Sequence, residues 1–262
     1  MLRLSDVHKT FFPGTVNQRL ALNGVDLSLD EGDFVTVIGS NGAGKSTLLN
    51  VIAGSLGIDS GVIAIRGRSV AKLAEHKRAA GIARVFQDPQ AGTCPHLTIE
   101  ENLAVAWSRG HRRWLRPGVG RVRRQHFHDQ LATLGLGLER RMKHRVGLLS
   151  GGQRQALSLL MASFTRPDIL LLDEHTAALD PERAELVLSL TQQVVAESGL
   201  TALMVTHNMD HALRLGNRLL MMHEGRIMHQ LGPQDKSRAT VDDLLGLFVS
   251  SKVALSDRSL LG

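Results

Sequence analysis

The chain has little cysteine, few aromatic residues and no long apolar run. A single cysteine, Cys94, rules out an intrachain disulfide and favours a reducing compartment. Aromatic residues make up 3% of the 262 residues and tyrosine is absent, which argues against a ring platform for stacking nucleic-acid bases. Apolar runs such as Ile169–Leu172 fall far short of the roughly 20 residues that cross a bilayer. We therefore expect a soluble chain that reaches a membrane only through a partner.

The amino terminus also lacks a secretion signal, because Met1–Asp6 has no cationic start followed by an apolar core. The net charge is +6, and a basic balance fits nucleic acid, anionic lipid or a nucleotide as ligand. Much of the excess lies in one stretch, with Arg109, Arg112, Arg113, Arg116, Arg121, Arg123 and Arg124 close together. Two interpretations of this stretch stay open: a solvated surface, or a patch beside anionic lipid headgroups.

Apolar, β-branched runs predict buried strands of a parallel sheet. Such runs occupy Phe34–Ile38, Ile169–Asp173 and Thr201–Thr206. Between the last two, Asp180 and Pro181 predict a capped helix start, so strand, helix and strand form a right-handed crossover. The stretch from Thr98, which opens a capping box, to about Pro167 is helical and basic. We therefore expect an α/β core with an inserted helical lobe.

A glycine-rich loop follows the first of these strands. Residues 39–46 fit the pattern G-x-x-x-x-G-K-[ST], and glycines let backbone amides wrap around phosphates. Lys45 is expected to reach the β- and γ-phosphates, and the Ser46 hydroxyl to bind Mg²⁺. The loop follows a buried strand and opens a helix, which is the context that this motif requires. The expected nucleotide contacts are Gly39, Ser40, Asn41, Gly42, Ala43, Gly44, Lys45, Ser46 and Thr47.

Acidic and basic side chains follow the other two buried strands. Asp173 and Glu174 end one strand, where Asp173 can hold Mg²⁺ directly or through water and Glu174 can polarise the attacking water. A pair of capping carboxylates in a loop is the alternative. His207 follows Thr206, so it is placed to contact the γ-phosphate, although most of the 12 histidines in such a chain are surface or core residues.

A second anion-binding feature lies at Leu149–Gln153. Ser150 is placed to cap the helix that follows, and two glycines leave the amides open to an anion. A simple helix start is the alternative interpretation. The expected contact residues are Ser150, Gly151, Gly152 and Gln153.

Taken together, the sequence resembles the ATPase subunits of ATP-binding cassette (ABC) transporters over nearly its whole length. The family's elements occur in order: the Walker A loop Gly39–Thr47, the Q-loop Gln87, the signature Leu149–Gln153, Walker B Ile169–Asp173 with Glu174, the D-loop Ala178–Asp180 and the switch histidine His207. Phe11 matches the aromatic residue that stacks on adenine, with Phe12 as its neighbouring candidate and a core role as the alternative. His175 departs from the family, which usually has proline there, and this puts only the local turn in doubt.

The resemblance implies ATP and Mg²⁺ as cofactors, sandwiched between two head-to-tail subunits. It implies catalytic roles for Lys45, Gln87, Glu174 and His207, metal contacts from Ser46, Gln87 and Asp173, and a nucleotide contact from Asp180. The signature of one copy is expected to complete the ATP site of the other. The expected partners are a second copy or a paralogous cassette, a transmembrane permease that Gln87 and residues 88–100 face, and an extracytoplasmic solute-binding protein. No nucleic-acid partner is expected. The expected location is the cytoplasmic side of the inner membrane, as a peripheral subunit.

The resemblance also implies the P-loop NTPase fold of ABC ATPases. This fold has a RecA-like, mostly parallel core sheet, an N-terminal antiparallel β part and an inserted α-helical subdomain. We assign residues 1–97 and 168–262 to the ATP-binding core and 98–167 to the helical signature subdomain.

Within the family, details such as Val85–Pro89 and Leu172–Asp180 are similar to bacterial importers of tryptophan/tyrosine type. A soluble ABC ATPase acting on nucleic acid or the ribosome is the rival. It is disfavoured because the chain has one cassette, no CxxC pairs and no sustained heptads between Lys45 and Ser150. An ATP-binding module without turnover is disfavoured by intact Glu174 and His207.

Overall fold

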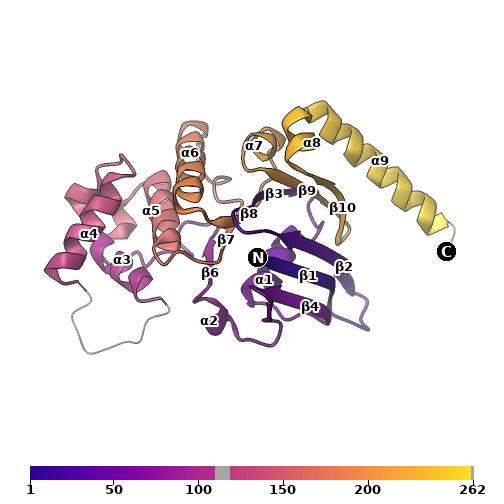
Figure 1. The fold of residues 1–262 in the computed structure, drawn as a ribbon, viewed down its shortest axis with the longest axis horizontal. Coiled ribbons are helices and arrows are strands. Elements are labelled where there is room, and N and C mark those ends of the chain that lie inside the picture. The colour runs from indigo at the N-terminus through magenta and orange to yellow at the C-terminus, as the bar shows by residue number, and fades with distance from the viewer. Residues whose placement is uncertain (110–118, 261–262) are drawn as a thin grey trace. The chain divides into compact units, whose positions relative to one another are not determined.

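The computed structural model describes residues 1–109 and 119–260, and the side chains of residues 1–109 and 119–250 (Figure 1). The chain forms two compact units: Met1–Ala74 with Thr201–Gly262 (unit 1), and Glu75–Leu200 (unit 2). Unit 2 therefore takes in more of the chain than the helical subdomain expected at residues 98–167. The subdomain boundaries expected from the sequence stay a prediction.

Unit 1 combines an antiparallel sheet, a mostly parallel set of strands and helices. The antiparallel sheet has the order β2-β1-β4-β5, and β9, β3 and β8 run parallel to one another with β10 antiparallel at the edge. The elements are β1 Leu2–Phe11, β2 Arg19–Leu29, β3 Phe34–Gly39, α1 Lys45–Ala53, β4 Ser60–Ile65, β5 Arg68–Ser69, β8 Thr201–Val205, α7 Met209–Arg214, β9 Arg218–His223, β10 Arg226–Leu231, α8 Pro233–Arg238 and α9 Val241–Leu260.

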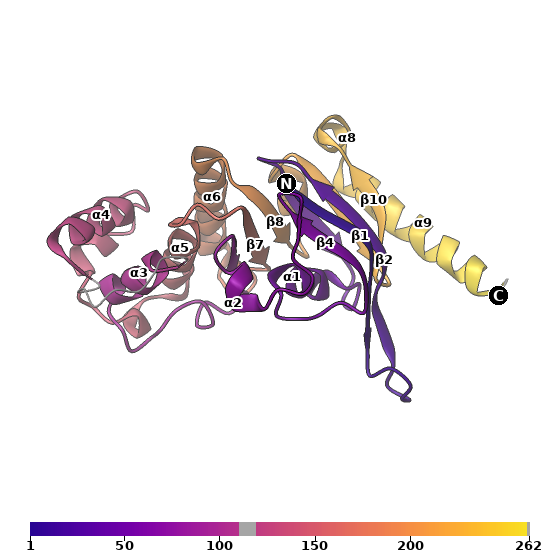
Figure 2. The same cartoon turned by 60° about the horizontal axis from the view of Figure 1, so that its bottom comes forward.

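The antiparallel sheet lies beside the helix that follows the glycine-rich loop. Figure 2 shows β1, β2 and β4 side by side, with α1 next to them, and α1 contacts both β2 and β3. The register pairs Leu2 with Leu29 and Leu4 with Leu27, and all four of these side chains are buried. The alternation of apolar and polar residues along β2 thus turns one face of the strand toward the core.

The strands β9 and β10 form a closing antiparallel hairpin. Glu224 and Gly225, the turn residues, both have positive φ, 46° and 76°. Positive φ at both central residues is the type of turn that matches the twist of a hairpin, and glycine adopts it without strain.

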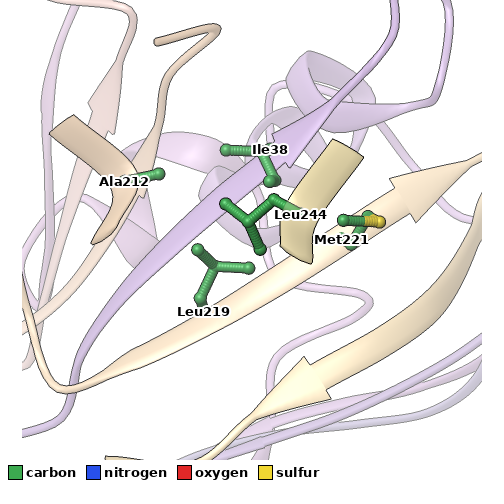
Figure 3. Packing of buried hydrophobic residues seen from close by; sticks show 5 residues of the cluster. All are labelled: Ile38, Ala212, Leu219, Met221 and Leu244. Carbon is green, nitrogen blue, oxygen red and sulfur yellow. The ribbon is translucent and has the colours of Figure 1, made fainter. Parts of the chain in front are cut away.

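A small apolar cluster joins the last helix of unit 1 to its strands. Leu244 of α9 packs with Ile38 of β3, with Leu219 and Met221 of β9, and with Ala212 of α7 (Figure 3). Each of these side chains is at most 2% exposed. This packing fixes the start of α9. Helices in proteins gain most of their stability from such tertiary packing.

Unit 2 is mainly helical. The strands described in it, β6 and β7, pair in parallel. The helices α3, α4 and α5 lie between these strands in the sequence, as was expected of the helical lobe. The elements are α2 Glu75–Arg78, β6 Ile82–Val85, α3 Ile99–Trp107, α4 Arg121–Ala132, the 3-10 helices η1 Leu138–Arg141 and η2 Val146–Leu148, α5 Gly151–Ser163, β7 Ile169–Asp173 and α6 Pro181–Ser198.

Several of the few aromatic side chains gather in unit 2. Phe127 of α4 stacks on Phe164 at a centroid distance of 5.8 Å, and Trp107 of α3 meets Phe164 edge to face. Phe127 is fully buried. These rings join α3, α4 and the end of α5 into one small core.

The basic stretch around residues 109–124 is only partly described. Arg112, Arg113 and Arg116 lie outside the described residues, and Arg124 pairs with Glu100 through its Nε at 2.8 Å. Among the helices described, none is long and apolar enough to span a bilayer.

Candidate nucleotide-binding site

The glycine-rich loop begins at the carboxyl end of β3. Gly39 passes so close to β9 that a Cβ there would collide with the carbonyl oxygen of Met222. Gly44, the N-cap of α1, has a φ of 99°, and a Cβ there would collide with the carbonyl oxygen of Ala21. Both positions therefore require glycine. Because glycine has no side chain, the backbone itself lines the loop at these positions.

Lys45 lies across this loop. It is 7% exposed, and its Nζ donates to the carbonyl oxygens of Gly39 at 2.7 Å and Ser40 at 3.2 Å. The first amides of α1 have no acceptor within the helix and give its start a partial positive charge. A glycine cradle, a helix start and an ammonium group thus meet in one loop. These residues fit a chain of phosphates.

His207 leaves the same edge of the sheet as this loop. β8 runs parallel to β3 with Val205 opposite Val37, and the amide of Thr206 donates to the carbonyl oxygen of Val37 at 3.1 Å. His207 follows Thr206 and is exposed. His207 and the loop thus follow the carboxyl ends of neighbouring parallel strands, the end of a sheet where ligands bind.

Phe11 and Phe12 end the first strand. Phe11 is the last residue of β1 and is half-buried, whereas Phe12 is 65% exposed with a φ of 51°. Their ring centroids are 6.4 Å apart. A half-buried ring leaves part of its face open for stacking, and the contact of Phe11 with adenine stays a prediction.

In unit 2 the carboxyl ends of β6 and β7 carry the other strand-end residues. Val85 of β6 pairs with Leu172 of β7 in parallel, so Gln87 and Glu174 follow strands that end at the same edge. Gln87 is exposed. Glu174 has a φ of 43°, a conformation that side chains adopt rarely and that functional sites tolerate.

Asp173 is already paired within unit 2. Its Oδ2 accepts from Nη2 of Arg84 at 2.5 Å, and the two side chains are 13% and 15% exposed. The Arg84 guanidinium also lies over the Phe86 ring, 4.8 Å from its centre. Since one carboxylate oxygen is held by arginine, Oδ1 is left for a metal ion or a water of its shell.

The signature residues start α5 with a capping box. The amide of Gln153 donates to Oγ of Ser150 at 3.3 Å, and Oε1 of Gln153 accepts from the amide of Ser150 at 3.2 Å. Gly152 is buried, and a Cβ there would come within 3.2 Å of Arg183. A helix start is therefore part of their role, and the free amides of α5 remain suited to an anion.

The D-loop residue Asp180 also caps a helix. Its Oδ1 accepts from the amide of Arg183 at 3.2 Å, and its Oδ2 pairs with Nε of the same arginine at 3.2 Å. A Cβ on Gly151 would lie 3.3 Å from Leu179, so the D-loop and the signature are neighbours within unit 2. The structure thus groups the expected residues in two sets. Unit 1 holds Phe11, residues 39–47 and His207, and unit 2 holds Gln87, Asp173, Glu174, Ser150–Gln153 and Asp180.

Three contacts of these sets were not expected from the sequence. Arg84 holds Asp173, Gln155 donates through Nε2 to the carbonyl oxygen of Phe86 at 2.9 Å, and Arg19 donates to the carbonyl oxygen of Gly42 at 3.0 Å. Arg84 carried a signal, because a charge inside the apolar strand β6 needs a partner. Gln155 and Arg19 carried none, since their partners are distant in the sequence.

His175 has a structural role. It is 1% exposed, and its Nε2 lies 3.0 Å from Oγ1 of Thr191 in α6. The Thr191 hydroxyl donates to the carbonyl oxygen of Val187 at 2.8 Å, so His175 is the donor in the other bond. The departure from the family at this position thus fixes the turn after Glu174 to α6.

Comparison with known proteins identifies the family. The model of the ABC transporter family matches residues 22–177. The chain is 42% identical over 253 residues to a tyrosine transport ATP-binding protein of Clostridioides difficile, which covers 95% of this chain and 98% of that protein. It is 33% identical to a spermidine/putrescine import ATP-binding protein of Hahella chejuensis, of which it spans 60%.

Solved structures agree with these sequences. An ATP-binding cassette solved as a dimer bound to ADP and phosphate matches with a TM-score of 0.76 at 30% identity, over 89% of this chain and 99% of that one. The ADP conformation of another ABC transporter cassette matches with a TM-score of 0.77 at 27% identity, over 95% and 98%. The expected fold is confirmed, and the transport names of the relatives do not favour the nucleic-acid or ribosome rival. The chain belongs to the ABC transporter family and is an ATP-binding subunit with ATPase activity.

Proposed function

We propose that this ATPase energises import of an amino acid, with tyrosine, tryptophan or a related solute as the cargo, through a separate transmembrane permease. The observation that carries this proposal is the 42% identity to a tyrosine transport ATP-binding protein over nearly the full length of both chains. The sequence details at Val85–Pro89 and Leu172–Asp180, which are similar to bacterial importers of tryptophan/tyrosine type, also support it.

In this proposal ATP binds with its phosphates in the loop and its base on Phe11. Lys45 and the amides of α1 neutralise the β- and γ-phosphates. Mg²⁺ supplies further neutralisation of the phosphates, and Ser46, Asp173 and Gln87 offer the oxygen atoms that such an ion prefers. Glu174 polarises the attacking water, and His207 orients it against the γ-phosphate.

The proposed assembly is a head-to-tail dimer. Ser150–Gln153 and Asp180 of one copy complete the site of the other, so that ATP holds the copies together and loss of the γ-phosphate releases them. All elements are present in this chain, which supports a homodimer with two working sites. Gln87 and residues 88–100 face the permease on the cytoplasmic side of the membrane, and a solute-binding protein delivers the cargo from the other side. Nucleic acid has no part in this assembly.

Uptake of labelled amino acids tests the proposed cargo. In cells that carry Lys45→Ala at the native locus, we expect at least a tenfold loss of tyrosine or tryptophan uptake, because the phosphates lose their main cation. Cells with Arg3→Met, which removes one exposed charge of β1, are the matched control and keep normal uptake.

Uptake measured across all the amino acids would contradict the proposal if none of them depended on Lys45. If the purified native protein hydrolysed ATP in that case, the ATPase assignment would stand and the amino-acid cargo would be wrong.

A further inference from the structure

Arg19, the first residue of β2, is bonded to the phosphate loop itself. Its Nη2 donates to the carbonyl oxygen of Gly42 at 3.0 Å. Gly42 has a φ of 82°, and a Cβ there would collide with this same Nη2. The positive φ favours glycine at position 42, and without a side chain there the guanidinium can lie against the backbone of the loop.

Arg19 is also the direct neighbour of Phe11. The two residues pair across β1 and β2. Side chains directly opposite in an antiparallel pair project from the same face, with Cβ atoms about 5 Å apart. Arg19 thus adjoins both the proposed adenine contact and the phosphate loop, and all three lie within unit 1.

The guanidinium has spare donors and, among the residues that the structure describes, no carboxylate partner. Arg19 is exposed, and the bond to Gly42 is the one hydrogen bond recorded for its side chain among the described residues. A guanidinium carries five N–H groups, so the other groups remain open to a ligand. A cation held at the rim of a phosphate loop, and paired with no acid of the described part of the chain, suits an anionic oxygen.

We propose that Arg19 binds the α-phosphate of the nucleotide, an inference that rests on the proposed nucleotide site. A nucleotide with its base on Phe11 and its β- and γ-phosphates in the loop must carry its α-phosphate between the two. Arg19 adjoins both ends of that path. Its planar fork can bond a phosphate oxygen while Nη2 keeps the carbonyl of Gly42, which a single ammonium group does less well.

The choice of phosphate separates this role from a purely structural one. The α-phosphate is present in AMP, ADP and ATP, so a direct contact contributes equally to all three. If Arg19 only braced Gly42, its loss would disturb the loop, and only nucleotides with phosphates in the loop would bind more weakly.

Calorimetric titration of the full chain tests the proposal, using AMP, ADP and the non-hydrolysable ATP analogue with an imido bridge. Arg19→Met is expected to weaken all three by about the same factor, roughly tenfold, the loss typical of a hydrogen bond to a charged group. Arg19→Lys keeps the charge and should retain part of the affinity. Arg3→Met is the matched control, expected to bind as the native chain does. Thermal unfolding shows which variants fold. If Arg19→Met does not fold, the nucleotide affinities of Arg19→Lys and Arg19→Gln are compared instead.

Several results would overturn the assignment. If Arg19→Met bound all three nucleotides as tightly as the native chain, Arg19 would not contact the α-phosphate. If only ADP and the ATP analogue bound more weakly, the role of Arg19 would be limited to supporting the loop at Gly42. In the reserve pair, equal affinity of Arg19→Lys and Arg19→Gln would show that the charge does not act on the phosphate. A native chain that binds no nucleotide would instead remove the proposed site, and with it this inference.

Discussion

Asp173 is the proposed metal-binding carboxylate of this ATPase, and Arg84 forms an ion pair with it. The 2.5 Å bond fixes Oδ2, and both side chains are largely buried, so the carboxylate cannot turn freely. Residues that hold a metal-binding carboxylate commonly matter nearly as much as the ligand itself. Arg84, on the neighbouring strand β6, thus fixes the orientation of the Asp173 carboxylate, and in the proposed site it would present that carboxylate to Mg²⁺.

Arg84→Met should therefore raise the Mg²⁺ concentration needed for half-maximal ATPase activity by about tenfold, the low end for loss of such a partner. Arg84→Lys, which keeps a cation beside Asp173, should raise it less. The measurement is a Mg²⁺ titration of phosphate release at fixed ATP. An unchanged Mg²⁺ requirement in Arg84→Met would show that the ion pair only stabilises the fold.

The residues of the motifs could be predicted from the sequence because each depends on its immediate neighbours. Gly39 and Asp173 are the last residues of the buried strands β3 and β7, and Glu174 directly follows β7. Arg84 and Arg19 could not be assigned, because their partners at Asp173 and Gly42 come from other elements. Pairing of distant residues is a property of the fold, and a single sequence does not reveal it.

At the scale of elements, local signals predicted the helix starts. Thr98, Ser150 and Asp180 each accept from a backbone amide of the first turn, as their positions indicated. The last two helices of unit 1 were not predicted. Their anchors are tertiary: Leu244 of α9 in the apolar cluster, and Lys236 of α8, whose side chain is 4% exposed.

Lys236 fastens α8 to the strands through backbone oxygens. Its Nζ donates to the carbonyl oxygens of Leu215, Gly216 and Arg218 and to Oγ1 of Thr36. Burial lowers the pKa of Lys236 to about 8. Replacement by methionine leaves buried acceptors without their donor, so we expect Lys236→Met to lower the free energy of unfolding by about 2 kcal/mol.

The effect of this substitution should depend on pH. An unfolded lysine has a pKa of about 10.4, so between pH 8 and about 10.4 the unfolded chain binds more protons at this site than the folded chain. Lys236 therefore makes the native protein more stable as pH rises through this range, and below pH 8 that gain is absent. Denaturant unfolding at pH 7 and pH 9.5 measures the free energy of unfolding of the native protein and of Lys236→Met. The difference between the two should be larger at pH 9.5, and a smaller difference at pH 9.5 would contradict the account.

At the scale of the whole molecule, the chain divides its chemistry between two units. Unit 1 holds the phosphate loop and His207, and unit 2 holds Glu174 and the signature. In the proposed dimer a complete site needs a signature from the other copy. This arrangement makes the subunits interdependent, which mixtures of variants can reveal.

Two defective variants should form one good site when mixed. In the Glu174→Gln background, Lys45→Ala and Ser150→Arg should each retain little ATP as homodimers. In a mixed dimer, the loop of the Ser150→Arg copy faces the signature of the Lys45→Ala copy, and both are intact. We expect about one ATP retained per mixed dimer after gel filtration. Retention no greater than that of the separate variants would mean that the signature acts within its own chain. Ser150→Arg also removes a helix cap, so its unfolding midpoint must be checked.

Light scattering of the Glu174→Gln variant, with and without MgATP, is the most direct test of the central claim that ATP is bound between two copies of this chain. Without turnover the nucleotide stays in place, so the mass should rise with MgATP from that of one 28.5 kDa chain to about twice that value. It should not rise when Lys45→Ala is added to the same variant. A mass that stays the same with millimolar MgATP, while the nucleotide is bound, would contradict the claim.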